Sequence, residues 1–445
     1  MPAFLKRIRN HFSPFQMILF GFAAVILIGA LLLMMPISSK AGEMTSFPDA
    51  LFTATSAVCV TGLIVKDTAT YWSTFGQVII LFLIQIGGMG VITVSAAVAI
   101  ISGKKIGLMQ RDTMQESLSA PSVGGIVRLT RFILRAIILI ELIGAVVLMP
   151  VFIRDFGIRG IWMSFFHSIS AFCNAGFDLM GQREAFSSLT SYSAQPVVNS
   201  VIMLLIVIGG IGFLTWEDVC KNGICFRKYR MQSKVILITS AVLILFPAVF
   251  FFCKEFSDLP IGERIFASLF QSITTRTAGF NSVDLRSMSD AGLLLMIPLM
   301  LVGGSPGSTA GGLKTTTLAV LFASVLSIFR KRSNTQMLNR RISDETVKHA
   351  AVIFMIYLTL FFTGGFIICA VEGLPLLDCL FETASAVGTV GLSLGLTPSL
   401  GMISRTILIF LMFFGRVGCL TLIYATLGKN IKSVSKSPLD KITVG

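Results

Sequence analysis

The sequence predicts an all-α polytopic membrane protein, a single domain in which four pseudo-repeats surround one central axis. Three observations lead to this prediction. Of the 445 residues, 54% are hydrophobic and 13% are charged, with a mean hydropathy of +0.85, whereas soluble domains have about 25% charged residues. Long apolar stretches alternate with short ones, and the short ones resemble one another. Basic residues gather in one set of the intervening loops.

Eight apolar stretches are long enough to cross a membrane as helices. Each can span about 30 Å of hydrocarbon at roughly 1.5 Å per residue. They cover residues 17–36, 76–101, 132–153, 197–216, 234–253, 291–329, 350–371 and 404–427. We expect repeats at about residues 15–103, 128–218, 232–332 and 346–430, followed by a cytoplasmic tail at 431–445.

Charge predicts the orientation in the cell membrane. The N-terminus, the loops 102–135, 217–234 and 330–348, and the tail from residue 428 hold 24 Lys and Arg against 7 Asp and Glu. The rest of the chain holds 12 and 15. Because basic loops stay on the inner side, we expect both termini in the cytoplasm. This pattern accounts for the net charge of +14, so the sequence indicates no nucleic-acid partner.

Each gap that faces outward contains a short apolar segment, too short to span and typical of a re-entrant helix. Each segment begins with Phe, carries Ser or Thr four residues later, and ends at Gly followed by Leu or Phe. The segments lie near residues 49–59, 162–173, 263–275 and 377–387 and end at Gly62, Gly176, Gly279 and Gly391. These glycines are 114, 103 and 112 residues apart, a period typical of a repeat architecture.

A helix that ends inside the membrane leaves carbonyl oxygens with partial negative charge. The irregular backbone that follows is tolerated only beside water or inside protein. Glycine accepts positive φ, so successive carbonyls can turn toward one axis and replace the hydration shell of a monovalent cation. The predicted filter residues are Cys59, Val60, Thr61 and Gly62; Cys173, Asn174, Ala175 and Gly176; Arg276, Thr277, Ala278 and Gly279; and Gly388, Thr389, Val390 and Gly391. A single copy would fit a small-residue helix contact equally well, but four copies favour a filter.

A glycine cluster follows each filter strand within the next long stretch, where small residues let backbones approach closely. The clusters are 87–90, 209–212, 303–304 and 415–418. In the fourth cluster Arg416 stands where the other clusters have their second glycine. An arginine in a span must face water or a partner. We therefore expect Arg416 at the waist of a pore, or alternatively paired with a buried acid such as Glu141.

The third cluster continues into a segment that cannot form a regular helix. It consists of Gly303, Gly304, Ser305, Pro306, Gly307, Ser308, Thr309, Ala310, Gly311 and Gly312. Proline and repeated glycine oppose a helix, and the surrounding stretch of 39 residues is about twice as long as a span requires. The sequence predicts a flexible intramembrane loop between two half-helices. Lys314, just after it, is expected to contact the loop or a lipid head group.

These segments, above all Thr275-Arg276-Thr277-Ala278-Gly279-Phe280 and the loop 303–312, resemble the Trk/Ktr/HKT superfamily of potassium transporters, and the Ktr-type membrane subunit most closely. The resemblance covers essentially the whole chain. It implies a K⁺ selectivity filter with one strand from each repeat, gated from below by the loop and the arginine. Glycine at all four filter positions implies K⁺ over Na⁺, because some plant relatives that carry Na⁺ have Ser in the first repeat.

The resemblance also implies partners. The family's membrane subunit is usually a homodimer in the lipid bilayer, with one pore per chain, and a cytoplasmic RCK-type ring called KtrA regulates it by binding ATP, ADP or NAD(H). The cytoplasmic loops are too short for a nucleotide-binding domain. We therefore expect nucleotide only on the partner, no covalently bound cofactor, and K⁺ as the transported ion. Channel-like and Na⁺-coupled transport both remain open.

Other functions fit the sequence less well. A sodium or ammonium pathway of the same fold is the nearest alternative. A membrane enzyme is disfavoured because paired carboxylates, a Cys-His pair and metal-ligand spacing are missing near the expected filter. A receptor or scaffold would not need four short segments that end in glycine.

Overall fold

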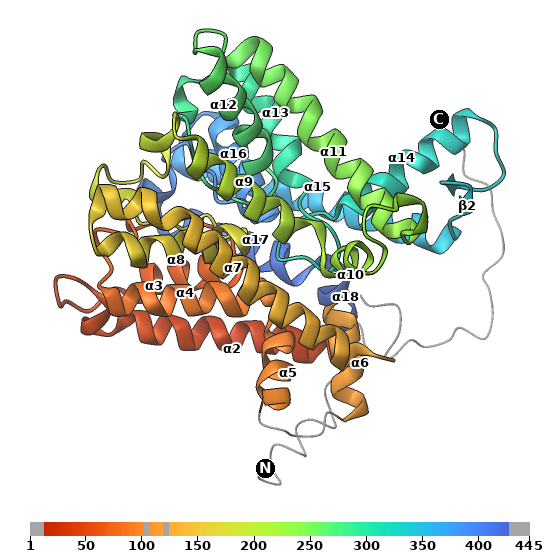
Figure 1. Cartoon of the computed structure of the whole chain (residues 1–445), viewed down its shortest axis with the longest axis horizontal. Helices are drawn as coiled ribbons and strands as arrows, with labels where there is room; N and C mark the ends of the chain where they lie inside the picture. The colour runs from red at the N-terminus through yellow and green to blue at the C-terminus, as the bar shows by residue number, and fades with distance from the viewer. Residues whose placement is uncertain (1–12, 102–106, 119–123, 427–445) are drawn as a thin grey trace.

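The computed structural model describes residues 13–101, 107–118 and 124–426. Figure 1 shows a helical protein whose coloured segments follow one another around a central region. The expected tail 431–445 lies outside the described residues. So do residues 102–103 of the expected first repeat and 427–430 of the expected fourth repeat. The expected polytopic all-α architecture is confirmed, since nearly all regular structure is helical.

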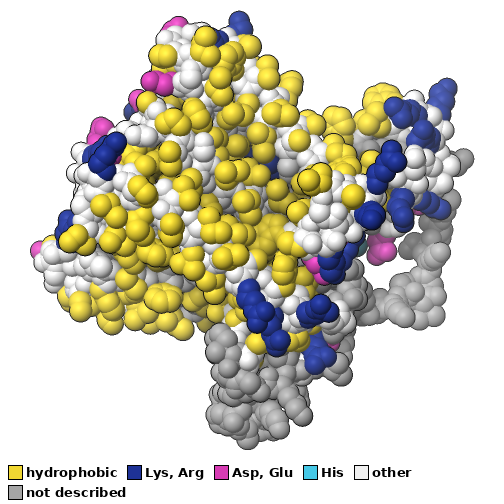
Figure 2. Space-filling model, viewed as in Figure 1, with side chains coloured by type: hydrophobic (Ala, Val, Ile, Leu, Met, Phe, Trp, Pro, Cys, Tyr) yellow, Lys and Arg dark blue, Asp and Glu magenta, His cyan; other side chains and the backbone are white. Residues whose placement is uncertain are grey.

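Each repeat begins with a long apolar helix. These are α2 (Pro14–Met34), α7 (Ile126–Phe156), α11 (Met231–Phe250, extended to Glu255 by a π-helical turn) and α15 (Asp344–Glu372). All four are long and apolar enough to cross a membrane. Many of their apolar side chains are exposed, and Figure 2 shows an almost uninterrupted hydrophobic surface over this part of the molecule. An apolar surface of this extent marks a face that contacts lipid or another protein.

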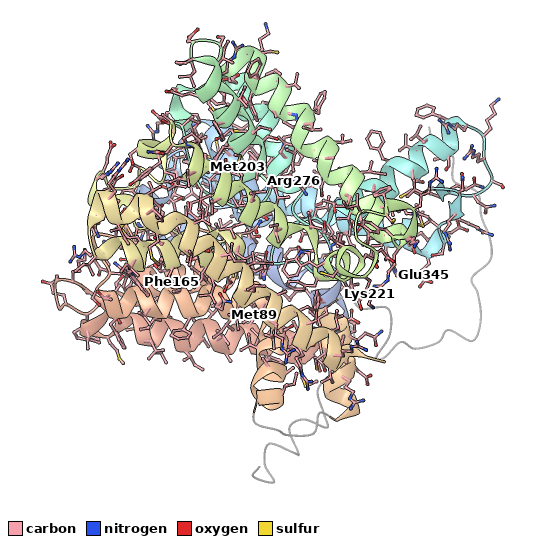
Figure 3. The ribbon with its side chains drawn as sticks, in the orientation of Figure 1. Met89, Phe165, Met203, Lys221, Arg276 and Glu345 are labelled. Atoms are coloured by element: carbon pink, nitrogen blue, oxygen red, sulfur yellow. The ribbon has the colours of Figure 1, made fainter. Side chains whose placement is uncertain are left out.

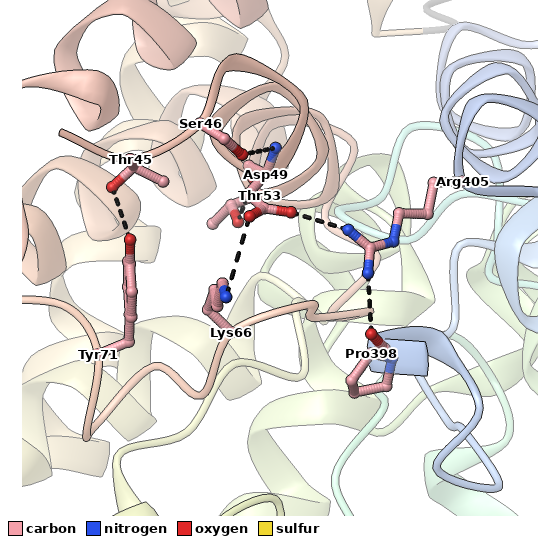
Figure 4. Close-up of polar contacts among 8 residues, drawn as sticks. All are labelled: Thr45, Ser46, Asp49, Thr53, Lys66, Tyr71, Pro398 and Arg405. Carbon is pink, nitrogen blue, oxygen red and sulfur yellow. Dashed lines mark hydrogen bonds and ion pairs between the residues drawn. The ribbon is translucent and has the colours of Figure 1, made fainter. Parts of the chain in front are cut away.

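The short helices expected from the sequence are α3 (Phe47–Val58), α8 (Arg159–Phe172), α12 (Ile261–Thr274) and α16 (Leu376–Gly388). Their Phe side chains at the start of each repeated motif are fully buried. In α3 the hydroxyl of Ser46 accepts a hydrogen bond from the amide of Asp49 (Figure 4), which satisfies an unpaired N–H at the helix start. All four short helices are therefore held inside the protein.

The second spanning helices differ from the expectation because they are broken. The expected spans 76–101 and 197–216 bend by 97° and 98° between helices. The pairs are α4 (Thr74–Met89) with α5 (Val91–Ile101), and α9 (Pro196–Ile211) with α10 (Phe213–Asn222). In the fourth repeat, the expected span 404–427 divides into α17 (Met402–Val417) and α18 (Cys419–Thr426). Each break is a glycine with positive φ, Gly90, Gly212 and Gly418, so backbone conformation explains the position of the bend.

The expected interruption of the stretch 291–329 is confirmed. Helix α13 (Asp290–Leu301) ends before the glycine-rich segment, and α14 (Thr315–Phe329) begins after it. Beyond α14 lies a hairpin that the sequence did not predict, formed by β1 (Gln336–Met337) and β2 (Arg340–Arg341). Helix α14 and the hairpin project from the right side of the molecule in Figure 1.

The fourth repeat closes against the first. Helix α17 packs against α3 and α2, and α18 packs against α2. On the opposite side from α18, Arg405 of α17 forms an ion pair with Asp49 of α3, with 2.8 Å between Nη1 and Oδ1 (Figure 4). Arg405 also donates to the carbonyl oxygen of Pro398. The four repeats thus form a closed arrangement.

The short helix α6 (Leu108–Ser117) lies against α2 and α7.

Candidate ion pathway

The four motif glycines form a closed ring. Their φ angles are +91° at Gly62, +68° at Gly176, +79° at Gly279 and +94° at Gly391. A Cβ atom added to any of them would lie under 3.0 Å from a carbonyl oxygen of the next repeat, closer than real Cβ atoms approach. In the order of the glycines just given, these oxygens belong to Ala175, Ala278, Val390 and Thr61. The strands therefore stand in the order of the sequence, and the fourth touches the first.

A second left-handed residue lies two positions before each glycine. These are Val60, Asn174, Thr277 and Thr389, with φ of +55°, +57°, +68° and +51°. A side chain in this region costs about 1–3 kcal/mol of backbone strain, more often seen at functional sites than elsewhere. The same costly conformation at four equivalent positions means that surrounding contacts impose it. Sequence alone did not reveal it, because none of these residues favours positive φ strongly except Asn.

The N–H groups of each strand point back to the short helix before it. In the first repeat, Thr61 donates to the carbonyl oxygen of Ser56 at 2.8 Å, and Gly62 donates to the Ser56 hydroxyl at 3.1 Å. The fourth repeat has the same pair of contacts from Val390 and Gly391 to Ser385. In the described structure no donor within the protein contacts the carbonyl oxygens of Thr61, Ala175, Ala278 and Val390. These oxygens are therefore available to a ligand.

The Ser or Thr of each motif fastens its strand. In the second and third repeats the hydroxyls of Ser170 and Thr274 donate to the carbonyl oxygens of Phe177 and Phe280, at 2.7 and 2.6 Å. Those residues directly follow the motif glycines. The hydroxyl thus bridges the end of the short helix and the residue beyond the strand, which explains why the sequence repeats it at this spacing.

On the side away from the loop 303–312, the ring opens into a cavity of about 630 Å³ that all four motif glycines line. Its wall includes acidic side chains at Asp178, Glu184 and Asp284, and the cation Arg286. Burial raises the pKa of Asp178 to about 7, and the nearby carboxylate of Asp67 acts in the same direction. The mouth therefore carries a carboxyl whose charge changes near neutral pH.

On the other side of the ring, the glycine-rich loop 303–312 lies against the filter residues. The hydroxyl of Thr309 donates to the carbonyl oxygen of Phe172 at 3.1 Å and contacts the amide oxygen of Asn174 at 3.2 Å. A Cβ atom on Gly311 would collide with the side chain of Thr389. The loop therefore packs directly beneath strands of the second and fourth repeats.

The ends of the loop meet. The amide of Gly303 donates to the carbonyl oxygen of Leu313 at 2.8 Å, and that of Thr315 to Gly304 at 3.1 Å. Other loop contacts involve two of the glycine clusters: Ser305 and Thr309 donate to Gly210 and Gly209, and Gly312 donates to Gly415. The carbonyl of Gly307 accepts from Phe213, directly after the second cluster. The loop is thus held at both ends and along its length.

The glycine clusters also allow close helix contacts. A Cβ atom on Gly87, Gly209 or Gly415 would meet the carbonyl oxygen of the last or next-to-last residue of a short helix under 3.0 Å away. These oxygens belong to Val58, Phe172 and Val387. Small residues are therefore required at these positions because the ends of the short helices rest on them.

Arg416 contacts the loop and not Glu141. Its guanidinium donates to the carbonyl oxygens of Thr309 and Gly87, and to that of Gly88 at 3.0 Å. The alternative pairing with Glu141 is wrong, because both oxygens of that carboxylate accept from the amide of Gln85. The expected contact of Lys314 with the loop is present, with 2.8 Å from Nζ to the carbonyl oxygen of Ala310.

Two further charged side chains near the strands are buried. Arg276 belongs to the third strand, but its side chain is buried behind that strand between α9, α11 and α12, where Nη2 lies 3.3 Å from the hydroxyl of Ser240 (Figure 3). The buried Glu382 of α16 accepts from Thr397 and from the amide of Leu394, so it fixes the loop beyond the fourth strand. Of Arg276, only the backbone can belong to the ring.

Comparison with known proteins gives one consistent result. The family model TrkH, described as a cation transport protein, matches residues 7–432. The chain is 40% identical to the potassium/sodium uptake protein NtpJ of Enterococcus hirae, covering 99% of both chains. It is 41% identical to Ktr system potassium uptake protein B of Bacillus subtilis, covering 93% of both. The fold matches the crystal structure of the potassium transporter TrkH from Vibrio parahaemolyticus with a TM-score of 0.71 at 18% identity, over 92% of this chain and 85% of that one.

Proposed function

Because this chain belongs to the TrkH family of cation transport proteins, we propose that it is a potassium uptake subunit whose four motif strands form the ion filter. The observation that carries the proposal is the closed ring of left-handed glycines with unengaged carbonyl oxygens, which opens to the outer cavity. Carbonyl rings of this kind replace the hydration shell of K⁺. The filter sites would use the backbone oxygens, with K⁺ as the cargo.

A second cargo has one observation in its favour. The relative from Enterococcus hirae is named a potassium/sodium uptake protein. The fold is common to carriers of either ion, so the selectivity of this chain is the quantity to measure. Glycine at all four ring positions favours K⁺, since each added Cβ would push into a neighbouring carbonyl and change the spacing of the oxygens.

The loop 303–312 is the proposed gate, with Lys314 and Arg416 as its two cationic contacts. Three facts support this role. The loop packs against Asn174 of the filter; its backbone has no regular secondary structure; and Arg416 donates to its carbonyl oxygen at Thr309. Fixed positive charge beside the path would oppose cation passage. Opening would require the loop and the guanidinium to separate.

Regulation is proposed to come from a separate cytoplasmic ring subunit. Three relatives are named as parts of a Ktr system. The basic segment 330–348 carries Arg330, Lys331 and Arg332 at the end of α14. Such a ring would dock on this side, where both termini are proposed to lie. A homodimer with one pore per chain completes the proposed assembly, and nucleotide would bind only to the ring.

The test uses purified chain in potassium-loaded liposomes. We expect K⁺ flux that exceeds Na⁺ flux at equal gradients, and further change when the candidate ring subunit is added with nucleotide. Uptake by cells that lack their own potassium systems provides the second readout. Equal or greater Na⁺ flux would assign the pathway to sodium, and the absence of any flux from correctly inserted protein would refute the proposal.

A further inference from the structure

A groove of about 480 Å³ runs between α11 and α14 and ends at the hairpin. Its walls are apolar over most of their length. The wall residues include Val235, Ile238 and Val242 of α11, and Leu318, Phe322 and Leu326 of α14. Ile238, Val242 and Phe322 are 46%, 58% and 66% exposed. Since α11 is one of the membrane-spanning helices, this groove lies along the lipid-facing surface.

The end of the groove toward the hairpin is cationic. Arg330 and Arg332 line it together with Gln336, whose amide oxygen accepts from Arg332 at 3.2 Å. Within residues 124–426 neither arginine forms an ion pair with an acidic side chain. Figure 2 shows basic side chains at the tip of the projecting arm, next to hydrophobic surface. The groove thus has an apolar part, which suits a hydrocarbon chain, and a positively charged end without an acidic partner.

We propose that this groove binds one anionic phospholipid, with an acyl chain between α11 and α14 and its phosphate at Arg330 and Arg332. The dimensions fit one leaflet. Leu318 and Arg330 are twelve helical residues apart, or about 18 Å at 1.5 Å per residue, and half of a bilayer's hydrocarbon core is about 15 Å. Guanidinium groups bind phosphate oxygens in a bidentate geometry. A head group without a choline cation keeps its net negative charge, so two unpaired arginines favour an anionic lipid over a zwitterionic one.

The position of the groove connects the lipid to the proposed gate. Helix α14 begins at Thr315, directly after the loop and Lys314. A second hollow of about 400 Å³ lies on another side of α14, against α11 and α15, so two sides of α14 border unfilled space. A lipid that fills the groove stabilises α14 where it now stands, with the loop against the filter. Bound lipid therefore lowers ion flux; this regulatory step rests on the proposed function, whereas lipid binding does not.

The binding experiment uses the full chain and native mass spectrometry in mixtures of phosphatidylglycerol and phosphatidylcholine. We expect one phosphatidylglycerol retained per chain, and at least tenfold weaker retention in the R330Q/R332Q double variant. The matched control is R340Q/R341Q, which removes two charges from the same arm but not from the groove, and it should bind as the parent does. Ala319→Trp, which fills the trough without changing charge, should also displace the lipid.

Several outcomes would overturn the proposal. Equal retention by R330Q/R332Q and R340Q/R341Q would show that binding is nonspecific. Full competition by inorganic phosphate would identify a phosphate site without a lipid requirement. Loss of dimer in R330Q/R332Q, with no lipid retained by the parent, would identify the groove as a contact between two copies. In flux assays, phosphatidylglycerol should slow the parent but not R330Q/R332Q; loss of that difference with binding intact would reject only the coupling to the gate.

Discussion

The guanidinium of Arg416 donates a hydrogen bond to the carbonyl oxygen of Thr309, so a cation from the fourth repeat fastens a loop that belongs to the third. The same guanidinium reaches Gly87 and Gly88 of the first repeat. Three repeats therefore meet at one side chain beneath the ring. If the loop moves during ion passage, these contacts are the ones that must break.

Arg416→Gln should increase K⁺ flux per inserted molecule. The change removes the positive charge and the charge-assisted bonds to the loop, each about 1.5–3 kcal/mol. Even partial loss shifts the loop equilibrium by about tenfold. Flux in liposomes, normalised to inserted protein, measures the effect. Arg416→Lys, which keeps the charge, is the control and should stay near the parent value; a Gln variant with unchanged flux per molecule would show that the residue only supports the fold.

Deletion of Ser305–Ala310 should give high K⁺ flux without any ring subunit. The structure makes this shortening feasible, because Gly303 lies against Gly311 and Gly304 lies against Ala310. The remaining ends therefore need little rearrangement to join. Flux is compared with and without the partner. A folded deletion variant whose flux is no higher than the parent's would mean that the loop is not the barrier.

Gly391→Ser should reduce the preference for K⁺ over Na⁺ by about tenfold or more. A Cβ atom there meets the carbonyl oxygen of Thr61 and also requires positive φ. Gly373→Ser separates the two effects, since Gly373 has φ of +67° and nothing within 4 Å of the added atom. The control should keep parental selectivity, as measured by ion competition. The same loss is expected for Ser at Gly62, Gly176 and Gly279, and parental selectivity in all four variants would contradict the filter assignment.

Flux at low K⁺ should fall as the outer pH drops through about 7. Burial raises the pKa of Asp178 to about 7, so this carboxylate is charged above that pH and neutral below it. Its negative charge attracts cations to the mouth, and protonation should lower flux about twofold to threefold at subsaturating K⁺. Asp178→Asn should remove the pH response, whereas Asp284→Asn, in the same mouth, should retain it. A response that persists in the Asp178 variant would assign it to another group.

The ion pair between Asp49 and Arg405 should stabilise the closure of the fourth repeat on the first. Arg405→Gln removes a partly buried pair and the bond to Pro398, at a cost of about 1–3 kcal/mol. Thermal unfolding in detergent measures the change as a lower midpoint. Lys66→Gln is the control, because Lys66 lies 4.0 Å from Asp49 and is more exposed. An equal decrease of the unfolding midpoint in both variants would show that the ion pair between Asp49 and Arg405 adds no more stability than the weaker contact of Lys66.

The sequence predicts the parts of this molecule that depend on composition and period. The short helices follow from apolar length and repeated motifs. The break in the stretch 291–329 follows from its helix-breaking residues, and the position of Arg416 follows from the repeated glycine cluster. The 97° and 98° bends at Gly90 and Gly212 do not follow, because each lies in a cluster of three glycines and composition does not show which of them adopts positive φ or whether the helix bends at all.

Side-chain direction was the other limit. Whether Arg416 faces Glu141 or the loop depends on how helices from different repeats are rotated, and no local pattern records that. Arg276 illustrates the same point: its place in the third motif predicted a filter residue, and its side chain lies behind the strand. The left-handed conformation of Val60 and Thr389 likewise arises from contacts made after the four strands assemble.

Because the four quarters of the ring are encoded in one polypeptide, each can acquire substitutions that the others do not share. A pore assembled from four identical chains would carry four guanidinium groups at the level where this chain carries one, since Gly88, Gly210 and Gly304 occupy the equivalent places. Four such cations around one axis would repel each other and entering K⁺ ions alike. Carrying all four repeats in one polypeptide thus permits a single positive charge at this level of the ring, a number that a homotetramer cannot reach.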